Sequence, residues 1–198
     1  MRVTFLGHVG MYVETEGGSV LCDPWFTPAY FASWFVFPRN DRLDVAPFLK
    51  PDFLYISHLH HDHYDPEWLI ENIDKSTTVL LPEFRVNHLE EALRECGFSN
   101  FIQTEHGAKH DLGGLEITIL AMTAPADGPA GDSAIVIADS TARILNQNDS
   151  RPRDADEVKN LGPYDGHFTQ FSGAIWYPMV YDFDAVEMEL LGRRKRTD

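Results

Sequence analysis

The chain has 198 residues, of which 43% are hydrophobic and 12% aromatic, and its formal net charge is −15. This length fits one domain with a sizeable core, and an acidic surface repels phosphate backbones, which excludes nucleic acid as a general partner. No stretch reaches the roughly 20 apolar residues that cross a bilayer, so we expect no stable membrane insertion. The two cysteines, Cys22 and Cys96, lie far apart and form no disulfide framework, which favours a cytoplasmic location.

Expected strands and helices follow one another along the whole chain. Alternating hydrophobic residues between turn signals predict strands over residues 2–7, 11–15, 19–22, 53–57, 77–81, 101–104, 115–121, 133–138, 142–146 and 167–172. Apolar periodicity and capping residues predict helices over residues 66–73, 87–96, 153–161 and 184–191. Asp65 is an expected helix N-cap, and Asn87 with Glu90 forms an expected capping box. The pattern predicts two packed sheets covered by helices, in a single domain over residues 1–198.

One stretch carries more metal-ligating side chains than any other part of the chain, and it reads His58-Leu-His60-His61-Asp62-His63. It follows a hydrophobic strand and precedes a helix. His58 and His60 are two residues apart and can point to one side of an extended loop, whereas Asp62 and His63 can face a second point. The spacing therefore predicts two adjacent metal ions. Imidazole and carboxylate donors suit zinc, iron or manganese.

The run from Ser57 to His63 resembles the signature of the metallo-β-lactamase superfamily. The similarity covers nearly the whole chain: residues 6–14, 21–25 and 132–149 resemble the family's opening hairpin, next strand and later strand pair. Residues 168–178 resemble the branch that includes the metal-fold portion of CMP-N-acetylneuraminate hydroxylases. The resemblance implies an α+β fold, a four-layer αββα sandwich with a two-metal site at one edge. Because the chain stops sooner than most of the family, it also implies a sandwich that is incomplete at its C-terminal end.

The resemblance assigns further ligands. Asp149 corresponds to the carboxylate that both metals share. The loop that carries a third histidine in the family has none here, and Asp127 is the best substitute, with an ordinary turn residue as the alternative. An aspartate in that place favours iron or manganese somewhat over zinc. His167 is the only histidine after Asp149 and is therefore the candidate last ligand, the alternative being a packed or exposed histidine.

Two residues near the N-terminus are expected to hydrogen-bond the metal-bound side chains, because metal-bound imidazoles usually donate their second N–H to a carboxylate or carbonyl. They are His8 and Asp23, and an Asp-Pro turn is the alternative role of Asp23. Seven aromatic residues lie in the segment 25–38. That segment could wall a substrate pocket, form a dimer face or touch a membrane, but a loop folded into the core is the favoured interpretation.

Three functions fit this pattern. The first is a hydrolase with two divalent ions, zinc foremost, that cleaves an ester, lactone, amide or phosphodiester of a small molecule, with Asp62 both holding a metal and accepting a proton. The second is a diiron oxygenase that needs a separate redox partner, because Cys22 and Cys96 do not form the paired motifs of a Rieske cluster. The third is a binding module whose metal site is degenerate.

Overall fold

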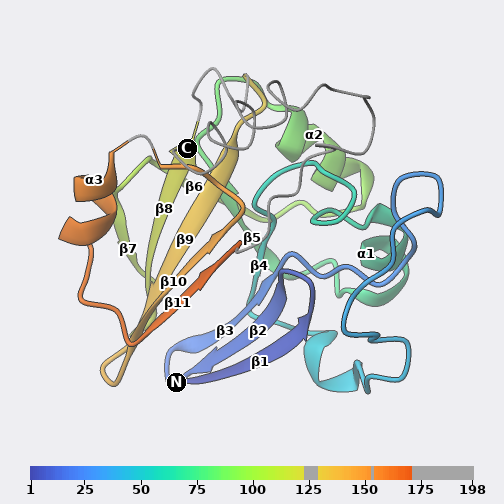
Figure 1. The fold of residues 1–198 in the computed structure, drawn as a ribbon, viewed down its shortest axis with the longest axis horizontal. Helices are drawn as coiled ribbons and strands as arrows, with labels where there is room; N and C mark the ends of the chain where they lie inside the picture. Colours follow the sequence, from blue (N-terminus) through green and yellow to red (C-terminus); the bar gives the residue numbers. More distant parts are fainter. Residues whose placement is uncertain (123–128, 153, 171–198) are drawn as a thin grey trace, which may run out of the picture. The chain divides into compact units, whose positions relative to one another are not determined.

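Two β-sheets form the frame of the fold, and Figure 1 traces them through the residues that the computed structural model describes, namely 1–122, 129–152 and 154–170. Residues Met1–Phe168 form one compact unit. A second unit covers Thr169–Asp198, and only its first two residues are described. The helix expected at 184–191 therefore lies outside the described residues, and a single domain over 1–198 stays a prediction.

The first sheet has six strands in the order β1-β2-β3-β4-β5-β6. The strands β1 to β3 pair antiparallel, whereas β3 to β6 pair parallel. Their bounds are Arg2–Gly7, Gly10–Thr15, Gly18–Cys22, Phe53–Tyr55, Thr78–Pro82 and Phe101–Thr104. Cys22 at the end of β3 pairs with Tyr55 at the end of β4. The residues that follow both strands therefore leave the sheet at the same edge, which is where parallel sheets present ligands.

The second sheet has five strands in the order β11-β10-β9-β8-β7. In chain order β7 to β11 span Lys109–Asp111, Glu116–Met122, Asp132–Ala138, Arg143–Asn148 and Gly166–Thr169. The sequence predicted four of these strands to within a few residues and missed β7. That strand has three polar residues and no apolar alternation; it is defined by its antiparallel pairing with β8.

Three apolar clusters lie between the four layers of the fold, one at each interface between neighbouring layers. The interior between the sheets is filled from both sides, for example by Val13 and Val20 of the first sheet against Ile117 and Ile137 of the second. The outer face of the first sheet packs under α1 (Pro66–Asn72) and α2 (His88–Glu95). The outer face of the second sheet packs under α3 (Ala155–Asn160), on the opposite side in Figure 1. The predicted αββα sandwich is confirmed.

The two predicted helix caps had different outcomes. Asp65 accepts the backbone N–H of Trp68 and so caps α1, as predicted. Asn87 occupies the N-cap position of α2, but its side chain makes no capping hydrogen bond, and Glu90 instead accepts from Arg94 one turn later. The predicted capping box was wrong because an i,i+4 ion pair competes for the same carboxylate. Among the described residues no helix is long and apolar enough to cross a membrane.

Candidate metal centre

The histidine-rich motif forms a tight loop between β4 and α1. His63 and Tyr64 both donate their backbone N–H to the carbonyl oxygen of His60, at 2.9 and 2.8 Å. This turn reverses the chain and brings the first and last histidines of the motif together. The ring centroids of His58 and His63 are 4.1 Å apart. Asp65 anchors the end of the loop by accepting hydrogen bonds from the backbone N–H groups of Phe26 and Thr27 as well as from α1.

The first group of candidate ligands comprises His58, His60 and Asp149, whose ligand atoms all lie within 4.8 Å of one another. Nε2 of His58 is 2.7 Å from Nδ1 of His60. Asp149 comes from the other sheet, directly after β10. Asn148 shapes that turn, since its side-chain oxygen accepts the N–H of Asp149 and its amide donates to the carbonyl of Ser133. We call these three residues the open group, because only His58 is fully buried.

The second group comprises His8, Asp62 and His63, again with ligand atoms within 4.8 Å of one another. Nε2 of His8 is 2.9 Å from Oδ2 of Asp62, and Nε2 of His63 is 3.8 Å from the same oxygen. Asp62 and His63 are buried, so we call this the buried group. The sequence predicted His8 as a hydrogen-bond partner of a ligand; the structure places its ring nitrogen among the candidate ligands themselves.

Asp149 lies between the two groups. Its Oδ1 is 3.6 Å from Nε2 of His63, and this oxygen is buried with no hydrogen-bond partner among the described residues. A buried, unpartnered carboxylate oxygen is costly unless something satisfies it, and a shared metal ion would do so. Each group supplies two imidazoles and one carboxylate, which suits the coordination of divalent ions. The residues therefore fit a two-ion centre.

Asp23 and Ser57 contact one imidazole of each group, that of His63 and that of His58. Ser57 donates its backbone N–H and its hydroxyl to the two carboxylate oxygens of Asp23, at 2.7 Å each. The same carboxylate is 3.1 Å from Nδ1 of His63, and the Ser57 hydroxyl is 3.0 Å from Nδ1 of His58. Asp132 adds a carboxylate oxygen 3.2 Å from Nδ1 of His58. These contacts turn the Nε2 atoms toward the candidate metal positions.

The carboxylates of the site set the charge of its histidines. Burial lowers the pKa of His63, but the hydrogen bond to Asp23 and the charges of the neighbouring carboxylates outweigh burial and raise it to about 9. Burial, helped by the charge of His58, holds the pKa of His60 below its usual value. Without a metal ion, His63 is therefore protonated at neutral pH and His60 is neutral.

Asp62 is poised to be a ligand more than a base. Burial raises the pKa of Asp62. Hydrogen bonds from His8 and Tyr30 and the charges of nearby histidines lower it by more than burial raises it, so the net pKa is well below the usual carboxyl value. Such a carboxylate stays ionised and is a weak proton acceptor, because a general base works best with a pKa near the working pH. This favours the metal-holding role predicted for Asp62 over the proton-accepting one.

Left-handed backbone conformations gather around the site. The described non-glycine residues with positive φ are His8, Asp23, Asn148 and the run 30–32. His8 and Asp23 bear site side chains, Asn148 precedes Asp149, and Tyr30 contacts Asp62. Such conformations persist where the surroundings over-determine them, and they concentrate at functional sites.

Two further predicted ligands have different outcomes. His167 lies on the exposed face of β11, and its Nε2 is 3.0 Å from the side-chain oxygen of Gln147. The structure places it in neither group, because strand alternation turns Phe168 inward and His167 outward. Asp127 lies outside the described residues. The sequence reasoning missed two contributors, Asp132 and Tyr30; Asp132 begins a fully buried strand, which was the one signal available.

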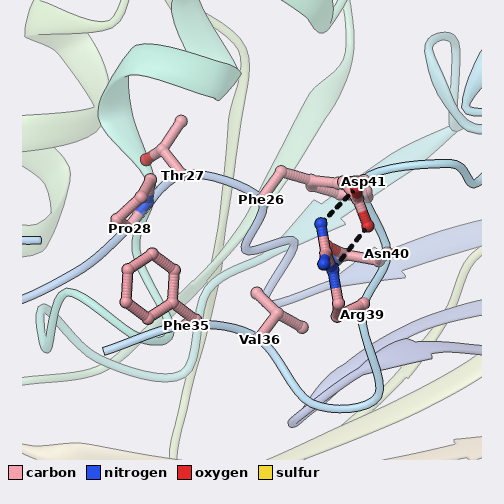
Figure 2. Close-up of a pocket in the computed structure, with 8 residues that line it drawn as sticks. All are labelled: Phe26, Thr27, Pro28, Phe35, Val36, Arg39, Asn40 and Asp41. Atoms are coloured by element: carbon pink, nitrogen blue, oxygen red, sulfur yellow. Dashed lines mark hydrogen bonds and ion pairs between the residues drawn. The ribbon is translucent and has the colours of Figure 1, made fainter. Parts of the chain in front are cut away.

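The aromatic segment 25–38 only partly follows the favoured interpretation of a loop folded into the core. Trp25 is buried, but Phe31, Phe35 and Phe37 are largely exposed, at 106%, 68% and 82%. Two hollows flank the segment. One, of about 400 Å³, is lined by residues 26–28, 35–36 and 39–41 (Figure 2).

The other hollow, of about 370 Å³, lies between the aromatic segment and the start of α1. Tyr30 and Phe31 line it on one side, and His61 and Glu67 line it on the other. Because the Tyr30 hydroxyl contacts Asp62, this second hollow lies next to the buried group, whereas none of the residues lining the first hollow belongs to either group.

Comparisons with known proteins agree with this fold. Residues 2–134 match the family model described as a β-lactamase superfamily domain. A Mycolicibacterium smegmatis protein named "Putative Rieske 2Fe-2S iron-sulfur protein" is 48% identical over 201 residues, which is 99% of this chain and 39% of that protein. The chain thus spans about two fifths of this relative. Cytidine monophosphate-N-acetylneuraminic acid hydroxylase of Danio rerio is 33% identical over 66 residues, 32% of this chain and 11% of that protein.

Solved structures share the fold at low sequence identity. CmlA, a diiron β-hydroxylase from Streptomyces venezuelae, has a TM-score of 0.61 at 18% identity, over 83% of this chain and 33% of CmlA. Isothiocyanate hydrolase from Delia radicum gut bacteria has a TM-score of 0.59 at 20% identity, over 81% of this chain and 67% of that chain. Similarity at this level concerns the fold.

Proposed function

This chain belongs to the β-lactamase superfamily, with the metallo-β-lactamase fold, and on that premise we propose that it is a metal-dependent enzyme with a two-ion centre for small-molecule chemistry. The observation that carries the proposal is the pair of ligand groups joined by Asp149, whose buried Oδ1 has no hydrogen-bond partner among the described residues. His58, His60 and Asp149 would hold one ion, and His8, Asp62 and His63 the other.

The side chains prepare the centre before any ion binds. Asp23 and Ser57 fix the imidazoles of His58 and His63, and Asp62 remains anionic. When bound, the ions supply chemistry that the side chains lack: iron exchanges electrons, and a divalent ion such as zinc lowers the pKa of a coordinated water from about 15.7 to about 7. The hollow of about 370 Å³ beside Tyr30 offers a place for a small substrate next to the buried group.

Of the reactions that such a centre supports, we place hydroxylation first, which reverses the order that the sequence suggested. Each ligand group is a set of two histidines and one carboxylate, the composition typical of non-haem iron oxygenases. The names of the relatives point the same way, since a Rieske iron–sulfur protein matches 99% of this chain. A hydroxylase needs an electron donor, and Cys22 and Cys96 are each buried and unpaired. We therefore propose that the donor is an iron–sulfur centre outside the present sequence.

Hydrolysis is the second candidate, and it is compatible with the fold, which isothiocyanate hydrolase shares. The same ligand groups would then hold zinc, and Asp149 would still join the two positions. Hydrolysis needs no electron donor, so the two candidates differ in the metal that the protein retains and in whether oxygen is consumed.

Metal analysis of protein purified without added metal separates the candidates. We expect about two ions per chain, as in two-metal enzymes, with iron predominating, and oxygen uptake when a chemical reductant is supplied. Zinc together with cleavage of ester or lactone test substrates would make hydrolysis the correct candidate. Less than one ion per chain, together with a His60→Ala variant that functions as well as the wild type, would contradict both candidates. The chain would then be a binding module with a degenerate metal site.

A further inference from the structure

Tyr30 is the only residue of the aromatic segment whose side chain is hydrogen-bonded to a candidate metal ligand among the described residues. Its hydroxyl donates to Oδ1 of Asp62 at 2.7 Å, while His8 contacts Oδ2 of the same carboxylate at 2.9 Å. We propose that Tyr30 is a positioning residue of the metal centre, whose hydroxyl fixes the Asp62 carboxylate so that Oδ2 alone faces His8 and His63. The inference rests on the proposed function, in which Asp62 binds an ion.

The ring of Tyr30 is held between two other rings. The Trp34 ring is 5.0 Å away at 68°, and the His61 ring is 5.6 Å away at 77°. Edge-to-face contacts of this kind restrain an aromatic side chain. His61, the one histidine of the motif that belongs to neither ligand group, thus has a place as a support for Tyr30.

The backbone of the segment is also shaped around Tyr30. Ala29 and Trp34 exchange backbone hydrogen bonds at 3.1 and 3.2 Å, and the Ser33 hydroxyl donates to the carbonyl oxygen of Tyr30. Between them, residues 30–32 all have positive φ, at 48°, 58° and 56°. Left-handed runs are unfavourable for L-residues. The segment therefore adopts a costly backbone conformation, and in that conformation the Tyr30 hydroxyl reaches Asp62.

The hydroxyl matters because a carboxylate has two oxygens that a metal ion can use. The hydrogen bond from Tyr30 to Oδ1 orients the Asp62 carboxylate so that Oδ2 faces the ion position. Without the hydroxyl, Oδ1 is free to rotate toward the ion or to bind it together with Oδ2. Loss of a hydrogen-bond partner of a ligand weakens metal binding by about 10–100-fold, and we expect about tenfold because His8, His63 and Oδ2 of Asp62 all remain as candidate ligands.

Tyr30→Phe tests this with Co²⁺ as the probe, and Tyr64→Phe is the matched control. Tyr64 also lies beside the motif, but its hydroxyl contacts the carbonyl of Ala92 and the sulfur of Cys96 instead of a ligand. We expect Tyr30→Phe to weaken Co²⁺ binding about tenfold and to change the visible ligand-field spectrum. Tyr64→Phe should leave both unchanged. The unfolding midpoint of the metal-free protein reports any structural damage.

The outcomes separate the inference from the proposed function. Equal Co²⁺ affinity and an identical spectrum in Tyr30→Phe and the wild type would overturn the inference and leave the metal centre standing. A wild-type protein that binds no Co²⁺ would overturn both. If Tyr30→Phe does not fold, Trp34→Leu keeps the hydroxyl but removes the ring that supports it; a smaller loss of affinity with the same spectral change is expected, and wild-type behaviour would count against the inference.

Discussion

The open group and the buried group have the same composition, two histidines and one aspartate, but they differ in how firmly the protein holds them. In the buried group His63 rests on Asp23, and Asp62 is held at both oxygens by His8 and Tyr30. In the open group His60 is exposed, and its Nδ1 lies 2.7 Å from Nε2 of His58, the other histidine of the group. The contrast teaches that identical ligand sets need not bind ions equally, because partners behind the ligands orient them.

The largest effect should come from His63→Ala. His63 lies between Asp62 and Asp149, so its loss affects both groups. We expect metal binding to weaken by more than the roughly 100-fold upper range typical of hydrogen-bond partners, measured by titration with Co²⁺ or Zn²⁺. His88→Ala, on the exposed surface of α2, is the control. If only one of two binding events were lost, the two groups would be more independent than the structure indicates.

The pH dependence should distinguish the groups next. Metal binding must displace the proton that His63 holds up to a pKa of about 9, so affinity for the buried position should rise up to about tenfold per pH unit from neutrality toward that value. His60, whose pKa is lowered, should give the open position a flatter profile. Two parallel profiles in a metal titration at several pH values would contradict the difference.

The metal-free protein should show the opposite trend in stability. The folded state raises the pKa of His63 from its usual 6.5 to about 9. Its protonation therefore stabilises the fold fully below the unfolded pKa, and this contribution is lost as the pH rises through about 9. Chemical unfolding of the metal-free protein at several pH values measures the loss, and His63→Ala should abolish it.

Asp23→Asn should weaken metal binding at the buried group by about 10–100-fold and lower the free energy of unfolding by about 1–3 kcal/mol. The side chain of Asp23 is fully buried. It accepts two hydrogen bonds from Ser57 and contacts Nδ1 of His63. An amide keeps the size but replaces one acceptor with a donor. Metal titration and denaturant unfolding measure the two effects, and a wild-type affinity would show that Asp23 is structural only.

The smallest effect should come from Asp132→Asn, which we expect to weaken metal binding by about tenfold or less. Asp132 contacts Nδ1 of His58, but the Ser57 hydroxyl lies near the same nitrogen. Comparison with Asp23→Asn by the same titration tests the contrast directly. A larger loss for Asp132→Asn than for Asp23→Asn would reverse the ranking of the two groups.

Local signals foresaw much of the fold. The strands at Arg2–Gly7 and Phe101–Thr104 were predicted to the residue, because apolar alternation between turn residues has few other interpretations. Asp65 capped its helix as predicted. The failures occurred where a distant or competing partner decides: β7 pairs with β8 in spite of its polar sequence, and Glu90 binds Arg94 instead of closing a capping box.

By itself the sequence predicted two packed sheets covered by helices and a ligand-rich loop, because both depend on short-range spacing: alternation, capping and the motif from His58 to His63. Only the tertiary structure decided which distant residues join each half of the motif. It joined His8 to Asp62, carried Asp149 from the second sheet to a position beside His63, and turned His167 outward. Those contacts connect residues tens of positions apart, and the order of residues along a chain carries no direct record of such distances.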